Sequence, residues 1–124
     1  MTTNVATKTF AGFAAAAVMA ATLLTSTAAS AYERWVYINN DGWTPIYSVE
    51  ISHVDDRYWG PDLLGPHIIE VGDYMMVEPV NPEGYCLFDV RITFDTGEVT
   101  YMEAVDLCRE TDIVADEFGA YAFG

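Results

Sequence analysis

The sequence predicts an all-β fold: an antiparallel β-sandwich, or a small barrel, of about six to seven strands with one disulfide. Three observations support this prediction. Apolar and polar residues alternate along most of the chain after Arg34, which is the period of a half-buried strand. Clusters of Asn, Asp, Gly and Pro interrupt the alternation at short intervals, as turns do. The chain also contains an even pair of cysteines behind a leader typical of exported proteins.

Residues 1–31 have the features of a signal peptide that is removed. Lys8 precedes the apolar run AGFAAAAVMAATLL, and the segment ends in Ala29-Ser30-Ala31, a small-x-small pattern that signal peptidase accepts. We therefore expect cleavage after Ala31 and a periplasmic or secreted product. The alternative is an uncleaved membrane anchor, for which about 18 to 20 apolar residues suffice. The Thr and Ser residues that interrupt the run favour cleavage.

The remaining segment, 93 of the 124 residues, has a strongly acidic composition. All 19 acidic residues lie there, with only four arginines, which gives a net charge of −15. Such a surface repels phosphate backbones and anionic lipid headgroups, so it argues against binding to nucleic acid or to a membrane surface. We also expect no membrane insertion of the mature chain. Solubility explains the charge most simply, and cation binding is the alternative.

Cys86 and Cys108 are expected to form the disulfide. Two cysteines in a small exported domain allow one intramolecular connectivity. On the chain-entropy model, closing this loop stabilises the fold by roughly 3 kcal/mol. A redox or metal site lacks support because the sequence has no C-x-x-C pair and no histidine beside either cysteine.

The first half of the domain is expected to contain four short strands. RWVYIN (34–39) is followed by an Asn- and Gly-rich turn and then by IYSVEISHV (46–54). HIIEV (67–71) and YMMVEPV (74–80) are expected to pair as a hairpin about Gly72-Asp73, with Pro79 marking an edge position or the end of the strand. The inward face of the second strand is expected to carry Tyr47, Val49, Ile51 and His53.

The clearest strand is CLFDVRITF (86–94), and EVTYMEAVDLC (98–108) follows it after an Asp-Thr-Gly turn. A one-residue slip would exchange the faces of the second of these strands, and we expect a β-bulge near Glu103. The sandwich domain is predicted to span 32–110, and the acidic, then Gly- and Ala-rich tail 111–124 is predicted to be flexible. The inward residues of the first strand are expected to be Cys86, Phe88, Val90, Ile92 and Phe94. Val99, Tyr101, Val105 and Leu107 share one face of the second strand, whose register the sequence leaves open.

Several spaced blocks of this region occur together in a known family. They are W-G-x-D-L-L-G at 59–65, C-x-x-D at 86–89, D-x-G at 95–97 and D-L-C at 106–108. The pattern resembles an uncharacterised family of small exported bacterial proteins, some of which are labelled twin-arginine (Tat) pathway signal proteins. This leader departs from that label because no Arg pair precedes its apolar run. The resemblance implies one exported domain and carries over no catalytic residue. The matching residues are Asn39, Gly42, Ile51, Ser52, Asp55, Asp56, Trp59, Gly60, Asp62, Leu63, Leu64, Gly65, Gly72, Cys86, Asp89, Asp95, Gly97, Asp106, Leu107 and Cys108.

The acidic loop after the second strand is the candidate metal site. Asp55, Asp56 and Asp62 could converge with loop carbonyls on calcium, which accepts six to eight oxygen ligands. Alternatively, Asp62 caps a tight turn while the other two carboxylates face water. His53 and His67 could form a metal set with Asp55, but packing at a strand end or a surface position is the favoured explanation for both histidines.

Aromatic residues exceed what a core of this size buries, and we expect a sugar- or peptide-contacting patch at Trp43, Tyr58 and Trp59. The run WGPDLLG is otherwise expected to pack, with Trp59 and the two leucines closing one end of the sandwich. No G-x-S-x-G elbow accompanies the serines. The sequence therefore favours an exported, non-enzymatic binding or structural module of the cell envelope whose partner is a protein or carbohydrate. A calcium-binding sandwich is the alternative, and a small secreted hydrolase is less favoured.

Overall fold

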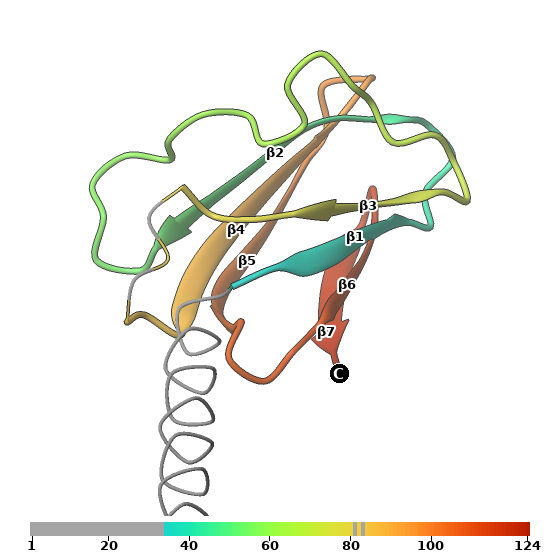
Figure 1. Ribbon diagram of the computed structural model, residues 1–124. Helices are drawn as coiled ribbons and strands as arrows, with labels where there is room; N and C mark the ends of the chain where they lie inside the picture. Colours follow the sequence, from blue (N-terminus) through green and yellow to red (C-terminus); the bar gives the residue numbers. More distant parts are fainter. Residues whose placement is uncertain (1–33, 81, 83) are drawn as a thin grey trace, which may run out of the picture. The chain divides into compact units, whose positions relative to one another are not determined.

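The computed structural model describes residues 34–80, 82 and 84–124, so the expected signal peptide over 1–31 lies outside the described residues. The described chain forms seven strands in two sheets, with strand orders β3-β1-β6-β7 and β2-β4-β5 (Figure 1). The β-sandwich is confirmed, and the sheets do not close into a barrel. The strands are β1 (Val36–Asn40), β2 (Ile46–His53), β3 (Tyr74–Val77), β4 (Leu87–Phe94), β5 (Val99–Asp106), β6 (Asp112–Asp116) and β7 (Gly119–Phe123).

Most strand pairs are antiparallel, and the exception lies in the centre of the four-stranded sheet. There β1 and β6 pair in parallel, with Ile38 opposite Ile113. Parallel neighbours need a long connection, and here that connection contains the whole three-stranded sheet together with β3. The described part of the chain contains no helix with the length and apolar character that a membrane crossing needs.

The core lies between the two sheets and follows the predicted alternation most closely on β4. Phe88, Val90, Ile92 and Phe94 are all at most 1% exposed. The opposing sheet contributes buried residues of β1 and β6, among them Ile38 and Ile113. Burial of each such side chain contributes about 1.5–3 kcal/mol, so this alternation is the main source of stability.

The predicted disulfide between Cys86 and Cys108 is confirmed. The S–S distance is 2.04 Å and the two Cα atoms are 5.1 Å apart. It joins the residue before β4 to the segment after β5. The antiparallel neighbours β4 and β5 are therefore fastened at the end opposite their turn.

The prediction of a flexible tail over 111–124 is wrong, because this segment forms β6 and β7. Ile113 and Ala115 are buried, and Ala120 and Ala122 pack against the core. The domain thus extends beyond the predicted 32–110 boundary. The small and acidic residues of this segment suggested a flexible tail, whereas its apolar residues recur at every second position, as in a pair of strands.

The predicted β-bulge near Glu103 is confirmed, and it corrects the faces assigned to this strand. Phe88 pairs with Val105, but Val90 pairs with Met102, so β5 contains one extra residue between these pairs. Ala104 adopts a φ of 53°, and its N–H donates to Asp89 Oδ1 at 3.0 Å. Because the bulge exchanges the faces, Thr100 points inward before it, while Val99 and Tyr101 are exposed.

A second irregularity explains why Tyr47 does not point inward as expected. The register of β2 against β4 shifts between Ile46 and Ser48, which leaves Tyr47 as the extra residue and 60% exposed. Val49 and Ile51 keep the predicted inward face.

The predicted hairpin of 67–71 with 74–80 is wrong. Ile69 bridges to Ile46 of β2, whereas β3 pairs with β1, so the Gly72-Asp73 turn carries the chain from one sheet to the other. Gly72 has a φ of 83°, a conformation that favours glycine. β3 is an edge strand that ends before the buried Pro79, as expected for proline.

Glu117, in the turn between β6 and β7, holds the turn between β1 and β2. Its carboxylate accepts hydrogen bonds from Trp43 N, Thr44 N and Thr44 Oγ1 at 2.8–3.2 Å, and the residue is only 8% exposed. A Cβ at Gly42 would overlap this carboxylate and displace it from its donors. Backbone and hydroxyl donors thus solvate a buried acid.

The variant Glu117→Gln should lower the free energy of unfolding by about 1–3 kcal/mol, because an amide nitrogen replaces an acceptor that faces backbone donors. Urea denaturation measures this loss. Glu98→Gln is the matched control, since Glu98 is exposed in the β4–β5 turn. Equal midpoints for the two variants would contradict the role given to Glu117.

Candidate functional site

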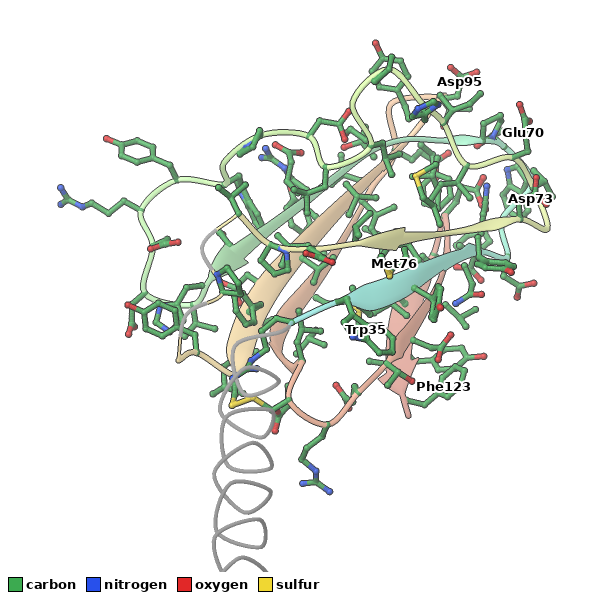
Figure 2. All side chains as sticks on the ribbon, in the orientation of Figure 1. Trp35, Glu70, Asp73, Met76, Asp95 and Phe123 are labelled. Atoms are coloured by element: carbon green, nitrogen blue, oxygen red, sulfur yellow. A yellow bond between two sulfur atoms is a disulfide. The ribbon has the colours of Figure 1, made fainter. Side chains whose placement is uncertain are left out.

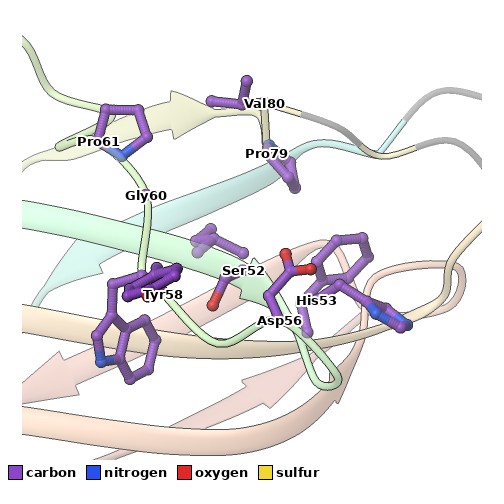
Figure 3. Close-up of a pocket in the computed structure, with 11 residues that line it drawn as sticks. Ser52, His53, Asp56, Tyr58, Gly60, Pro61, Pro79 and Val80 are labelled. Atoms are coloured by element: carbon purple, nitrogen blue, oxygen red, sulfur yellow. The ribbon is translucent and has the colours of Figure 1, made fainter.

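A pocket of about 130 Å³ opens where β2 ends (Figure 3). Its walls come from the end of β2, the loop that follows and the segment after β3. Figure 3 shows Tyr58 and Asp56 on one side of this pocket and Pro79 and Val80 on the other. We call this cavity the β2 pocket.

The loop after β2 turns back along the edge of that strand and so forms the pocket. Leu63 N donates to Val49 O at 2.7 Å, and Asp62 Oδ1 accepts from Val49 N at 3.0 Å. Farther along, Ile69 and Ile46 exchange two hydrogen bonds of 2.9 and 3.0 Å. The loop therefore satisfies part of an edge that would otherwise be open, and it places Trp59 and its neighbours beside the pocket.

The β2 pocket is apolar at its base and polar at its mouth. Phe88, Ile51 and Pro79 are buried. Tyr58 is 82% exposed, and the carboxylate of Asp56 faces solvent. This arrangement suits a group with an apolar body and a polar or charged end.

His53 lies in the wall of the β2 pocket and is held by packing. Its ring stacks on Tyr85 with centroids 3.7 Å apart and meets Phe88 edge-on at 6.2 Å. Its Nδ1 accepts a hydrogen bond from Asp55 N at 3.4 Å. Ser52 also lines the pocket, but consecutive strand residues point to opposite faces, which disfavours a serine–histidine pair.

The structure does not bring Asp55, Asp56 and Asp62 together. Asp62 Oδ1 accepts from both Val49 N and Leu64 N at 3.0 Å, which is the turn-capping role. In the described part of the chain, the one trio of potential metal ligands within 4.8 Å is Cys86, Asp106 and Cys108. Both sulfurs of that trio are in the disulfide. His67 is exposed in the loop and belongs to no such trio.

The expected patch of Trp43, Tyr58 and Trp59 divides into two places. Tyr58 and Trp59 line the β2 pocket. Trp43 lies shortly before β2 begins, at the end of that strand far from the pocket. Its ring meets the ring of Phe118 edge-on, with the ring centroids 5.2 Å apart. Trp43 and Phe118 are 63% and 83% exposed, so they form a separate aromatic projection.

Trp59 packs on the outer face of the three-stranded sheet, not at the end of the sandwich. Arg91 Cζ lies 4.8 Å from the centre of its ring, and the ring of Tyr101 lies 6.1 Å away. Arg91 Nε donates to Glu50 Oε1 at 3.0 Å, and this side-chain hydrogen bond raises the pKa of Arg91. Leu64, by contrast, is buried in the core, as expected.

Sequence reasoning missed a second surface, on the outer face of the four-stranded sheet. There Tyr37, Asn39, Tyr74 and Asp112 line a shallow depression of about 300 Å³. The signal was present in RWVYIN, where Trp35 and Tyr37 alternate with core residues. It was incomplete because the rest of the face comes from β7, within the segment expected to be flexible.

Comparisons with known proteins bear on the fold alone. No protein-family model matches the chain, and no curated protein matches it. The fold is similar to the NMR structure of a protein from Eubacterium rectale, with a TM-score of 0.51, 14% identity, and coverage of 75% of this chain and 91% of that chain. At this identity the likeness supports the architecture and carries no ligand or activity.

The variant Asp62→Ala should lower the free energy of unfolding by about 1–3 kcal/mol, because the N–H groups of Val49 and Leu64 lose their acceptor. Urea denaturation measures the change. Asp55→Ala, an exposed carboxylate of the same loop, should stay within about 0.5 kcal/mol of the parent protein. If Asp55→Ala lowered the free energy of unfolding as much as Asp62→Ala does, the charge of the loop, not the capping by Asp62, would be responsible.

Calcium should leave the melting temperature of the protein unchanged. The capping bonds occupy Asp62, and Asp55 and Asp56 form no cluster with it. Because a cation that binds only the native state must stabilise it, thermal melts in millimolar calcium and in a chelator test this directly. If calcium raised the melting temperature of the parent protein but not that of Asp56→Asn, the calcium site would be reinstated.

Proposed function

We propose that the protein is an exported, non-enzymatic binding module of the cell envelope. Its ligand is a polypeptide segment that places one lysine or arginine side chain in the β2 pocket. The observation that carries the proposal is the combination of a buried apolar base with an exposed carboxylate and aromatic rings at the mouth.

The size of the pocket supports a single side chain as the occupant. Sites for drug-sized ligands have volumes of about 300 Å³ or more, whereas this pocket measures about 130 Å³. A lysine or arginine stem would lie against Phe88 and Val80, and the cationic end would reach Asp56. Such side chains bury their methylene groups while the charged end stays near water.

Charge favours the same occupant. The chain has 19 acidic residues against five basic ones, a field that draws cationic segments toward the surface and repels anionic ones. Trp59 already receives the guanidinium of Arg91 on its ring. The neighbouring Tyr58 ring offers a comparable cation–π contact to a ligand at the mouth of the pocket.

Binding fits the described groups better than hydrolysis does. His53 Nδ1 accepts a backbone N–H and its ring is stacked, so the imidazole is fixed in the wall. Ser52 lines the same pocket, but none of the hydrogen bonds of the described residues joins its hydroxyl to His53. This arrangement supports a rigid recognition surface.

The test is an NMR titration with an acetylated, amidated Gly-Gly-Arg-Gly-Gly peptide, following the indole signal of Trp59. The control peptide contains citrulline, which keeps the shape of arginine without its charge. We expect saturable shifts with the arginine peptide and a clearly weaker response with citrulline.

Asp56→Asn should weaken binding of the arginine peptide up to about fivefold, as expected for an exposed ion pair. Asp95→Asn is the matched control: it removes the same charge beyond the opposite end of β4 and should weaken binding of the arginine peptide less. Equal effects of the two variants, or equal binding of both peptides, would overturn the proposal.

A further inference from the structure

We infer that the outer face of the β3-β1-β6-β7 sheet is a second binding surface, for an uncharged polysaccharide that lies across the strands. Two aromatic positions, one at Tyr37 and Tyr74 and one at Tyr121 and Phe123, each take a sugar ring. The polar pair Asn39 and Asp112 lies between them. We call this surface the aromatic face.

The register of the four strands aligns outward-pointing residues in two rows. Figure 2 labels Met76, Trp35 and Phe123 on this sheet, from β3 to β7. Trp35 precedes β1, and its ring lies 5.5 Å from that of Tyr37, which extends the surface. One row is Met76, Tyr37, Asp112 and Phe123, and the next is Tyr74, Asn39, Val114 and Tyr121.

Three of the four aromatic rings in these rows are exposed, and Tyr37 is half-buried. Tyr74 is 66% exposed, Tyr121 60% and Phe123 49%. Single exposed apolar residues are ordinary, but a connected group on one face indicates an interaction site. The rings also fix one another, since Tyr37 and Tyr74 meet edge-on at 5.6 Å and Tyr121 and Phe123 stack at 6.1 Å.

The polar centre of the aromatic face is preorganised. Asn39 Nδ2 donates to Asp112 Oδ1 at 3.3 Å and to Ile113 O at 3.1 Å, and Thr111 Oγ1 donates to Asp112 Oδ2 at 2.8 Å. Within the described residues, none donates to Asn39 Oδ1, so this oxygen remains an acceptor. Groups held in place before binding lose little entropy when a ligand arrives.

A neutral sugar matches this chemistry better than other occupants. The C–H face of a pyranose packs on an aromatic ring, while its hydroxyls donate to amide and carboxylate oxygens. An apolar protein surface would bury the free acceptor Asn39 Oδ1 without a donor, which is costly. Phosphate, sulfate or uronate groups would be repelled by Asp112 within a chain of net charge −14.

The spacing of the strands sets the length of the ligand. β1 and β7 are separated by β6, which is about 10 Å at the usual spacing of neighbouring strands. One sugar ring does not reach both aromatic positions. The ligand is therefore a chain of at least three rings, with its central ring over Asn39 and Asp112.

The test is isothermal titration of the protein with four neutral hexasaccharides: those of β-1,4-glucose, β-1,4-N-acetylglucosamine, β-1,4-mannose and α-1,4-glucose. At least one should bind, and its disaccharide should bind at least tenfold more weakly because it fills one position. Polygalacturonate, which is anionic, should not bind. If none of the four hexasaccharides binds, the inference is wrong.

Three tyrosine variants locate the site. Tyr74→Ala and Tyr121→Ala should each weaken hexasaccharide binding about tenfold, near the upper end for loss of one aromatic contact. Tyr47→Ala is the matched control, because Tyr47 is equally exposed, at 60%, but lies on β2 in the other sheet. Thermal melts of all three should match the parent protein, since exposed side chains contribute little to stability.

Equal effects of Tyr74→Ala and Tyr47→Ala would overturn the inference. So would equal hexasaccharide and disaccharide affinities, because they would exclude two positions. This site does not depend on the β2 pocket: Asp56→Asn should leave hexasaccharide binding unchanged, and Tyr74→Ala should leave binding of the arginine peptide unchanged. The two proposals can therefore fail separately.

Discussion

The buried carboxylate of Glu117 is the interaction on which the sandwich depends at one of its corners. The β1–β2 turn carries the chain from one sheet to the other, so the N–H groups of Trp43 and Thr44 have no strand partner. Glu117 accepts from Trp43 N and Thr44 N in place of such a partner. Asn40, 3% exposed, continues this network by donating to Thr44 O and Ile69 O. A buried polar network of this kind stabilises one arrangement only when every member is satisfied.

This corner connects distant parts of the chain and thereby sets both candidate surfaces. Glu117 follows β6, so the contact fixes where β6 and β7 lie relative to β1, and with them the rows of the aromatic face. Ile69, bonded to Asn40 and to Ile46, anchors the returning end of the loop that borders the β2 pocket. One polar cluster thus positions a sheet face and a pocket that share no residues.

The parts of the fold that sequence could predict are those with local signals. β4 follows from strict alternation, the disulfide from the number of cysteines, and the bulge at Glu103 from a break in the pattern. Sheet membership could not be predicted, because the pairing of Ile69 with Ile46, and of β1 with β6, joins segments far apart in the sequence. The same limit applies to the sites: Tyr58 and Trp59 were found as neighbours in the chain, whereas Asn39 and Asp112 meet only through the parallel pair.

The negative charge of the chain has two effects: it opposes self-association through the exposed aromatic face, and it acts differently at the two candidate surfaces. Repulsion between nineteen acidic residues opposes self-association, which offsets the tendency of exposed rings to associate. The same charge acts differently at the two sites. Asp56 is exposed, and no described residue donates a hydrogen bond to its carboxylate, so salt screens its attraction for a cation over a distance of about 10 Å. Asp112 is held by Asn39 and Thr111, so its oxygens act mainly as short-range acceptors. Ionic strength should therefore weaken the β2 pocket's affinity for a cationic side chain and leave affinity at the aromatic face nearly constant.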